Sequence, residues 1–488
     1  MSNCQNKTFF LDQHGCAKNQ VDGEILITLL QNKGMVKVDD ADKADLIIVN
    51  SCGFIESAKT ESIGSVMDAR KFYPNAKILF AGCLAERYAD ELMESLPEVD
   101  GILGNGDLSK VEESVEAIFN NERKAIRTPQ KGVYCGKRDT FLNYPGSTFI
   151  KITEGCDNCC SFCAIPVIRG RLRSRKASDI VQEIKELYAK GVKEFNLIGQ
   201  DLAAYGCGMD DDVFGNGTNY YKELYVNLKT PVIEDEFFEN HHSPLYQLCK
   251  MISEIDGKFW VRLLYIHPDH FNKDVLDVMN EDKRFLPYFD IPFQSGDSEI
   301  IRSMNRKGSA ESYKKVVKLI RNTLSESCIR TTFLTGFPGE NEKNAKNTDA
   351  FLKEIKSDWS GCFPYSREDN TKADLMENQV NTKVSEKRAK SLEKIQDKIT
   401  QESLRDRIGK IYDVLVEEIV VNENGTDEGL AIGRAWFEAP DVDGSFVIRY
   451  DLDDENAVKN IVPGNMVKVR SLTSSQVDMD GEYLGISE

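Results

Sequence analysis

The chain has 488 residues and a mass of 55.1 kDa, which is too long for one ordinary domain and predicts three, each with its own hydrophobic core. Hydrophobic residues make up 41% and charged residues 29% of the chain, a composition typical of globular rather than disordered proteins. The formal net charge of −18 repels phosphate backbones. It therefore argues against nucleic acid as the primary substrate and favours a basic partner.

No run of 18 apolar residues occurs, and the first 15 residues lack the apolar core of a signal peptide. We therefore expect no membrane contact and a cytoplasmic location. The chain has 13 cysteines. In a reducing compartment, cysteines are more often metal ligands, catalytic groups or buried packing residues than disulfides.

The first segment, residues 1–140, alternates short apolar runs with helix-like stretches. The apolar runs lie at 9–11, 46–49 and 78–81. Short apolar strands that alternate with helices are typical of a parallel sheet covered on both faces. We therefore predict an N-terminal α/β domain.

The second segment, residues 145–378, continues this alternation with at least five more strand-like runs. They lie at 149–152, 195–198, 261–264, 289–291 and 330–334. Repeated βα units in this number predict a full or partial (βα) barrel. A polar stretch rich in Asp and Asn, residues 206–244, interrupts the rhythm, and we interpret it as an insertion on the surface.

The end of the chain has a different pattern. Residues 379–410 are rich in Lys, Glu, Gln and Leu and have one apolar face, so they predict a connecting helix that Gly409 ends. Residues 411–488 alternate apolar and polar positions between clusters of Gly and Asp. This pattern predicts a small all-β barrel.

A loop with closely spaced cysteines carries the strongest signal for chemistry. Cys156, Cys160 and Cys163, here called the loop trio, have the spacing C-x3-C-x2-C. This spacing lets three thiolates bind three corners of one cubane iron–sulfur cluster and leaves the fourth iron open for a substrate group. The alternative is a structural zinc knuckle, which usually needs a fourth nearby ligand. Cys159 could be that ligand only by straining the loop, so we expect it to be a bystander.

A second set of cysteines follows the predicted strands of the first segment. Cys16, Cys52 and Cys83, here called the strand-end trio, each come shortly after one of its three apolar runs. Because the carboxyl ends of parallel strands meet at one edge of a sheet, these cysteines can converge. Buried apolar packing is the alternative for any one of them. Three at the same structural position favour a second three-cysteine cluster site.

The other cysteines show no ligand spacing, and we assign them to packing or to the surface. They are Cys4, Cys135, Cys207, Cys249, Cys328 and Cys362. His14, His267 and the pair His241-His242 also lack ligand spacing, so we interpret them as packed or solvated side chains.

The two trios and their neighbours resemble the radical S-adenosylmethionine (SAM) superfamily, and within it the methylthiotransferases. The stretches that carry this resemblance are 15–22, 50–55, 81–88, 155–163, 165–166 and 169–170. The resemblance implies an N-terminal methylthiotransferase α/β domain (1–140) and a radical SAM domain with a partial barrel (145–378). It further implies a connecting helix (379–410) and a TRAM-like β-barrel (411–488).

The resemblance also implies cofactors and their ligands. One [4Fe–4S] cluster on the loop trio would cleave SAM to a 5′-deoxyadenosyl radical, and a second [4Fe–4S] cluster on the strand-end trio would present sulfur. Phe162, Gln200, Gly336 and Glu340 would help to hold SAM and substrate, although a glycine such as Gly336 can simply form a turn. A reductase or flavodoxin-like donor would supply the electron.

The methylthiotransferases have two branches with different substrates. One modifies an adenosine of tRNA, and the other modifies the β-carbon of an aspartate in small-subunit ribosomal protein twelve. Several stretches resemble the protein-modifying branch: 200–201, 262–265, 336–340, 363–366 and, as the most telling, 439–444. The chain departs from the family pattern at Ser295, where a histidine is common, at Cys159 and in the insertion.

The charge of the last segment supports the same branch. Residues 411–488 contain 17 Asp or Glu and 5 Lys or Arg, a net charge of −12. A domain that binds tRNA should be basic, whereas an acidic one suits a basic ribosomal protein of the small subunit. A merely solvated acidic face is the alternative. For the whole chain, the competing hypotheses are a tRNA adenosine methylthiotransferase and a non-catalytic iron–sulfur or zinc protein that binds ribosomes.

Overall fold

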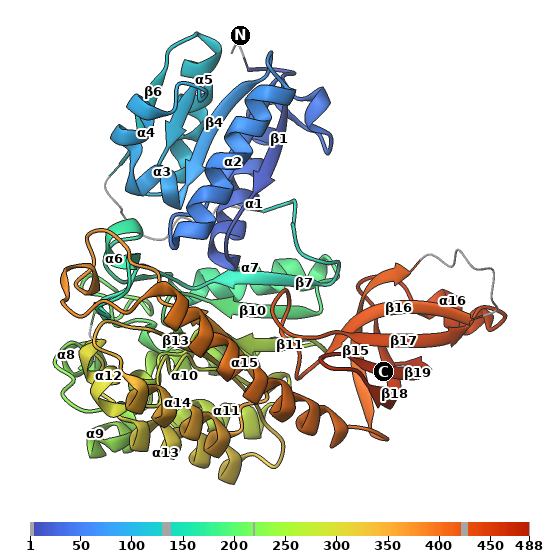
Figure 1. Cartoon of the computed structure of the whole chain (residues 1–488). Helices are drawn as coiled ribbons and strands as arrows, with labels where there is room; N and C mark the ends of the chain where they lie inside the picture. The colour runs from blue at the N-terminus through green and yellow to red at the C-terminus, as the bar shows by residue number, and fades with distance from the viewer. Residues whose placement is uncertain (1–3, 129–137, 218–219, 421–427, 488) are drawn as a thin grey trace.

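Three units make up the chain, as Figure 1 shows: an N-terminal α/β unit in blue, a central α/β unit, and a C-terminal β unit beside the central one. This computed structural model describes residues 4–128, 138–217, 220–420 and 428–487, so Cys135 lies outside the described residues. The predicted fold class is confirmed. None of the helices described is long and apolar enough to cross a membrane.

The N-terminal unit is a six-stranded parallel sheet with the order β2-β1-β3-β4-β5-β6. Its strands are β1 (Thr8–Gln13), β2 (Val36–Lys37), β3 (Leu46–Ser51), β4 (Lys77–Gly82), β5 (Gly101–Leu103) and β6 (Lys124–Ile126). Its helices are α1 (Ala17–Asn32), α2 (Glu56–Phe72), α3 (Cys83–Arg87), α4 (Ala89–Ser95) and α5 (Val111–Phe119). Every residue of β3 is buried, as expected for a central strand covered on both faces.

The central unit is a parallel sheet with the order β14-β13-β12-β11-β10-β7. Its strands are β7 (Ser147–Lys151), β10 (Glu194–Ile198), β11 (Trp260–Leu263), β12 (Phe285–Asp290), β13 (Cys328–Thr335) and β14 (Trp359–Pro364). β7 and β14 are not paired with each other in the described part of the chain, so the barrel is partial. A short antiparallel pair, β8 (Thr153–Glu154) and β9 (Arg173–Ser174), flanks the loop trio.

Helices alternate with these strands and bury one apolar face each. They are α6 (Ile165–Ile168), α7 (Ala177–Ala189), α10 (Pro244–Ser253), α11 (Asp274–Glu281), α12 (Ser298–Ser303), α13 (Ala310–Thr323) and α14 (Glu342–Ile355). In α7, for example, Ile180, Ile184 and Leu187 are buried at the helical spacing of three or four residues. They join the main core of the sheet.

The predicted insertion is only partly on the surface. It contains α8 (Tyr220–Val226) and α9 (Glu236–Glu239) and builds a small hydrophobic core of its own. Tyr221 and Tyr225, one helical turn apart, are each 6% exposed. The polar composition of the segment conceals this aromatic face, because Asp, Asn and Gly predominate in the stretch 206–219 just before it.

The C-terminal barrel confirms its prediction, and a long helix precedes it. Helix α15 (Thr382–Arg405) lies along β13 and β14. The closed barrel has the order β15-β16-β17-β19-β18. Its elements are β15 (Ile411–Val420), β16 (Glu428–Ala435), β17 (Phe446–Asp451), α16 (Glu455–Asn460), β18 (Met466–Ser474) and β19 (Met479–Ile486).

A buried ion-pair network joins the barrel to the central sheet. Glu194, the first residue of β10, contacts Arg434 at 2.7 Å and Arg262 at 3.0 Å. Trp359, the first residue of β14, donates its indole N–H to the carbonyl of Phe437 at 2.8 Å. The C-terminal barrel therefore packs against the amino ends of these strands, and both trios lie at the opposite, carboxyl ends of their sheets.

Candidate active site between two cysteine trios

The strand-end trio lies at one edge of the N-terminal sheet, as the sequence predicts. Cys16 follows β1 and is the N-cap of α1. Cys52 directly follows β3, and Cys83 directly follows β4 as the first residue of α3. Because β1, β3 and β4 are adjacent and parallel, all three cysteines emerge on the same side.

Two glycines bring the segments of the strand-end trio into contact. A Cβ atom placed on Gly15 would lie 2.9 Å from the Cβ of Cys52, and one on Gly53 would lie 2.8 Å from the backbone of Leu84. Gly15 also has a φ of +86°, a conformation that side chains disfavour. The sequence therefore needs glycine here because the cysteine-bearing segments touch.

The loop trio lies beyond β8, in the turn that leads into α6. Cys163 N–H donates to the carbonyl of Cys160 at 3.0 Å, and the left-handed φ of +50° at the exposed Cys159 lets the loop turn. Helix α6 begins two residues after Cys163. It forms a small apolar cluster in which Ala164 and Ile168 contact Cys83. The residues that directly follow the loop trio thus pack against Cys83 of the strand-end trio.

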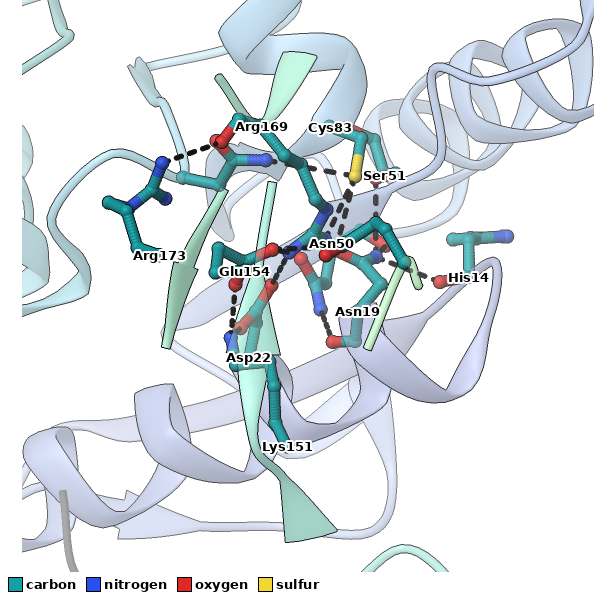
Figure 2. Close-up of polar contacts among 12 residues, drawn as sticks. His14, Asn19, Asp22, Asn50, Ser51, Cys83, Lys151, Glu154, Arg169 and Arg173 are labelled. Carbon is teal, nitrogen blue, oxygen red and sulfur yellow. Dashed lines mark hydrogen bonds and ion pairs between the residues drawn. The ribbon is translucent and has the colours of Figure 1, made fainter. Parts of the chain in front are cut away.

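An arginine strengthens this junction, as Figure 2 shows. Nη2 of Arg169 donates to Sγ of Cys83 at 3.1 Å. Nη1 of Arg169 pairs with Asp22 of α1 and with Glu154 of β8, each at 2.9 Å. Lys151 bonds the same two carboxylates. Burial acts to raise the pKa of Glu154, but the charges of Arg169 and Lys151 hold it well below its usual range.

The surroundings of Cys83 keep its thiol protonated when no metal is bound. Burial raises the pKa of the Cys83 thiol to about 12, and the nearby Arg169 only partly offsets this effect. A thiol in such surroundings stays protonated at neutral pH unless a metal takes the place of the proton. Sulfur is the donor that iron–sulfur clusters require, and the N–H of Arg169 can offset the charge of a metal-bound thiolate, so Cys83 fits a cluster ligand.

His267, which the sequence treats as an isolated histidine, lies beside the loop trio. Its Nε2 is 3.7 Å from Sγ of Cys160. Burial and the positive charge of Arg306 lower the pKa of His267 to about 3, so the ring is neutral at physiological pH. Because Nδ1 accepts the backbone N–H of Asp269, the ring proton is on Nε2 and points to Cys160.

The buried carboxylate of Asp201 links the insertion to the loop that carries the loop trio. The carboxylate of Asp201 contacts Nδ1 of His270 at 2.5 Å and the hydroxyl of Tyr225 at 2.9 Å, and it accepts an amide N–H of Asn158 at 2.9 Å. Sequence reasoning missed His270 and Tyr225. The signal for His270 was its place three residues after His267, in the segment that follows β11. Tyr225 gave no signal, since it lies in the insertion.

The four residues expected to hold SAM and substrate have different surroundings, and their role stays a prediction. Phe162 packs against a cluster that includes Met304 and Phe337. Gln200 donates to Glu154 at 3.0 Å, and its Oε1 is buried without a hydrogen-bond partner among the described residues.

Gly336 and Glu340 contact each other rather than the trios. The N–H of Gly336 donates to Glu340 at 2.9 Å, and Arg388 of α15 pairs with the same carboxylate at 2.8 Å. The turn they form is thus held against α15, and a Cβ on Gly336 would clash with Ser385.

Packing or polar contacts account for the remaining cysteines and histidines in the part of the chain that the structure describes. Cys4, Cys207, Cys249, Cys328 and Cys362 are buried. His14 bonds Asp12 at 3.2 Å, and His241 and His242 each stack on an aromatic ring.

Comparison with known proteins assigns the chain. Family models match in three places: uncharacterized protein family UPF0004 at 8–104, the radical SAM superfamily at 150–352 and the TRAM domain at 408–484. The ribosomal protein uS12 methylthiotransferase RimO of Treponema denticola is 49% identical over 96% of this chain and 99% of its own. This chain belongs to the RimO family of methylthiotransferases. Its RimO relative in Thermoanaerobacter sp. is 36% identical over 96% of this chain and 98% of its own.

As a RimO-family protein, the chain is a radical SAM methylthiotransferase, and SAM and an iron–sulfur cluster are its cofactors. The protein-modifying branch inferred from the sequence is therefore favoured over the tRNA enzyme and the non-catalytic protein. Among solved structures, the radical SAM methyltransferase TsrM of Kitasatospora setae matches at 14% identity over 76% of this chain and 77% of that chain, with a TM-score of 0.48.

Proposed function

We propose that this RimO-family enzyme acts in the cytoplasm and methylthiolates the β-carbon of an aspartate in ribosomal protein uS12. The names of its relatives support the substrate. The observation that carries the proposal is the contact of Arg169, six residues after Cys163, with Cys83. A reaction that uses both trios on one substrate atom needs them to lie this close.

The two trios fit two [4Fe–4S] clusters, each with one iron that no protein thiolate binds. The loop trio would hold one cluster, and the strand-end trio the other. When bound, the first would supply the reductive cleavage of SAM and the second the sulfur atom, with the electron coming from a reductase or flavodoxin-like donor. Gln200 suits SAM because its buried Oε1 can accept a hydrogen bond from the amino group.

The chain's own residues position these groups and exclude water. The neutral ring of His267 directs an N–H toward Cys160, and Arg169 directs one toward Cys83, so both sulfurs receive a donor. Hydrogen bonds to cluster sulfurs are one means by which proteins tune cluster potentials. Ala164 and Ile168 are fully buried against Cys83 and keep solvent away from its sulfur.

The acidic barrel supports a basic protein as substrate. Asp451, Asp453, Asp454 and Glu455 form an exposed run from the last residue of β17 to the first residue of α16. Opposite charges on two partners steer their encounter and fix their orientation. Ribosomal proteins are basic, so this run suits uS12 and opposes tRNA.

The test is mass spectrometry of uS12 after incubation with the reconstituted enzyme, SAM and a reductant under anaerobic conditions. We expect a methylthio mass gain on one aspartate of uS12 and none on tRNA. A gain on tRNA alone would contradict the proposed substrate. Iron and sulfide counts near eight and eight per chain, roughly, would support two clusters, and about four of each would contradict the second.

A further inference from the structure

Lys18 is a buried cation at the place where the two trios meet. It is the second residue of α1, two positions after Cys16, and only 8% of its surface is exposed. Its Nζ lies 3.3 Å from the centre of the Tyr265 ring, which belongs to the central unit. The side chain therefore leaves the N-terminal unit and points to the carboxyl end of β11.

Lys18 makes no ion pair with a carboxylate among the described residues. Arg306, beside the loop trio, makes none there either, but its guanidinium donates to the carbonyls of Pro292 and Phe293. Arg169 and Lys151 share the carboxylates of Asp22 and Glu154, and Arg330 pairs with Asp443. Burying an ammonium without an ion-pair partner costs free energy, and here the Tyr265 ring and the more distant charges of Cys16 and Asp290 offset that cost. Such a charge suits an anion that comes from outside the chain.

The residue beneath Lys18 is held in a strained conformation that places it between the trios. Tyr265 has a φ of +65°, which is rare for a bulky side chain, and its N–H donates to Asp290 at 3.2 Å. Two residues further on, His267 contacts Cys160. The short segment 265–267 therefore contacts Lys18 next to the strand-end trio and Cys160 of the loop trio.

We propose that Lys18 binds the carboxylate of the target aspartate and so determines specificity for an acidic side chain. This inference rests on the proposed function, because it requires an aspartate substrate. The carboxylate carbon is bonded directly to the β-carbon that reacts. When that carbon lies between the trios, its carboxylate must lie there too, and Lys18 is a buried cation there whose ammonium forms no ion pair or hydrogen bond among the described residues.

A simpler role for Lys18 would be to offset the negative charge of the Cys16 thiolate. The two roles make different predictions about the substrate. A residue that only offsets charge near Cys16 affects all substrates alike. A residue that binds the carboxylate distinguishes aspartate from asparagine, since the amide has no charge to pair with an ammonium.

The experiment measures binding rather than turnover, with anaerobic, reconstituted enzyme, SAM and no reductant. The ligands are uS12 and uS12 in which the target aspartate is replaced by asparagine. The enzymes are the wild type, Lys18→Met, which removes the ammonium but keeps the chain length, and Lys18→Arg, which keeps the charge. The control is Lys33→Met at the far end of α1, where the lysine is partly exposed and pairs with Glu112.

We expect the wild type and Lys33→Met to bind uS12 roughly 10- to 100-fold more tightly than the asparagine variant, the usual effect of one charge-assisted hydrogen bond. Lys18→Met should bind both ligands equally, and Lys18→Arg should recover part of the difference. Iron content and melting temperature, measured on each variant, show that the fold and the clusters are intact.

Two results would overturn the inference while the proposed function stands. In the first, Lys18→Met binds both ligands as tightly as the wild type does, or the wild type has no preference for aspartate. In the second, Lys18→Met loses affinity for both ligands by the same factor, which would assign Lys18 to the charge of Cys16. A wild-type enzyme that fails to modify uS12 under reducing conditions would instead overturn the proposed function, and the inference with it.

Discussion

Nη2 of Arg169 lies 3.1 Å from Sγ of Cys83, so a residue of the central unit contacts a predicted cluster ligand of the N-terminal unit. The same guanidinium pairs with Asp22 of α1 and Glu154 of β8. All of these side chains are buried. The contact therefore fixes the distance between the two trios with a network that neither unit could complete alone.

Replacing Arg169 with Gln should destabilise the protein strongly. The change leaves buried carboxylates at Asp22 and Glu154 with one cation fewer, and breaking a buried pair in this way costs about 3–5 kcal/mol. Urea unfolding followed by circular dichroism measures the loss. The matched control is Arg171→Gln, because Arg171 pairs with Asp157 at 2.7 Å but its side chain is 71% exposed. The free energy of unfolding of the control should fall by less than about 1 kcal/mol. Equal losses in Arg169→Gln and Arg171→Gln would contradict a structural role of the contacts that Arg169 makes.

Replacing one cysteine of the loop trio should stop a different reaction step than replacing one cysteine of the strand-end trio. Cys156→Ala should abolish formation of 5′-deoxyadenosine, because the loop trio would hold the cluster that binds SAM. Cys16→Ala should keep that activity and stop methylthiolation. Chromatography of the nucleoside and the mass of uS12 measure the two steps separately.

Cys159→Ala is the control for both substitutions, since Cys159 is exposed in the same loop. It should keep nucleoside formation and methylthiolation near wild-type levels. Loss of nucleoside formation in Cys16→Ala, with the melting temperature unchanged, would show that the strand-end trio is assigned to the wrong step.

A single methyl group at Gly15 should disturb the strand-end trio. In Gly15→Ala, the new Cβ would lie 2.9 Å from the Cβ of Cys52, at a backbone φ of +86°. We expect a loss of about 1–3 kcal/mol in the free energy of unfolding. Iron bound per chain should also fall, because the segments that carry Cys16 and Cys52 must separate.

Gly64→Ala tests whether any alanine would have the same effect. Gly64 lies within α2, and a Cβ there meets nothing within 4 Å. Alanine is a better helix former than glycine, so the free energy of unfolding of Gly64→Ala should rise by about 0.5–1 kcal/mol, and the variant should keep its iron. We expect the free energy of unfolding to fall in Gly15→Ala and to rise in Gly64→Ala. A change in the same direction in both variants would contradict the packing argument.

Local sequence patterns were enough to predict where the three cysteines of the strand-end trio lie, while their role as cluster ligands stays a prediction. The apolar runs 9–11, 46–49 and 78–81 lie within β1, β3 and β4, and each cysteine follows at the carboxyl end of its strand. The reason is physical, since a buried parallel strand is a continuous apolar run, and the topology of a parallel sheet brings its carboxyl ends to one edge.

The contacts between units could not be predicted in this way. Arg169 and Cys83 are 86 residues apart, and Tyr225 reaches Asp201 from within a polar insertion. Neither pair has a periodic pattern, because the partners come together only when separate units pack. His267 is similar, since its place beside Cys160 depends on how β11 and the loop meet.

The exposed acidic run at Asp453, Asp454 and Glu455 should speed the encounter with uS12. Neutralising it with Asp453→Asn, Asp454→Asn and Glu455→Gln should lower the association rate roughly 3- to 10-fold at low salt and change the dissociation rate little. Asparagine can replace Asp454 as the N-cap of α16, so the helix should be preserved. Surface plasmon resonance at several salt concentrations measures both rates.

The control must change the net charge by the same amount elsewhere. Asp90, Glu91 and Glu94 are exposed on α4 of the N-terminal unit, and their amide variants also remove three negative charges. If only the total charge matters, both triple variants should slow association equally. If the run on the barrel guides a basic substrate, its variant should slow association more, and the difference should vanish at high salt because ions screen exposed charges beyond about 10 Å at 0.1 M.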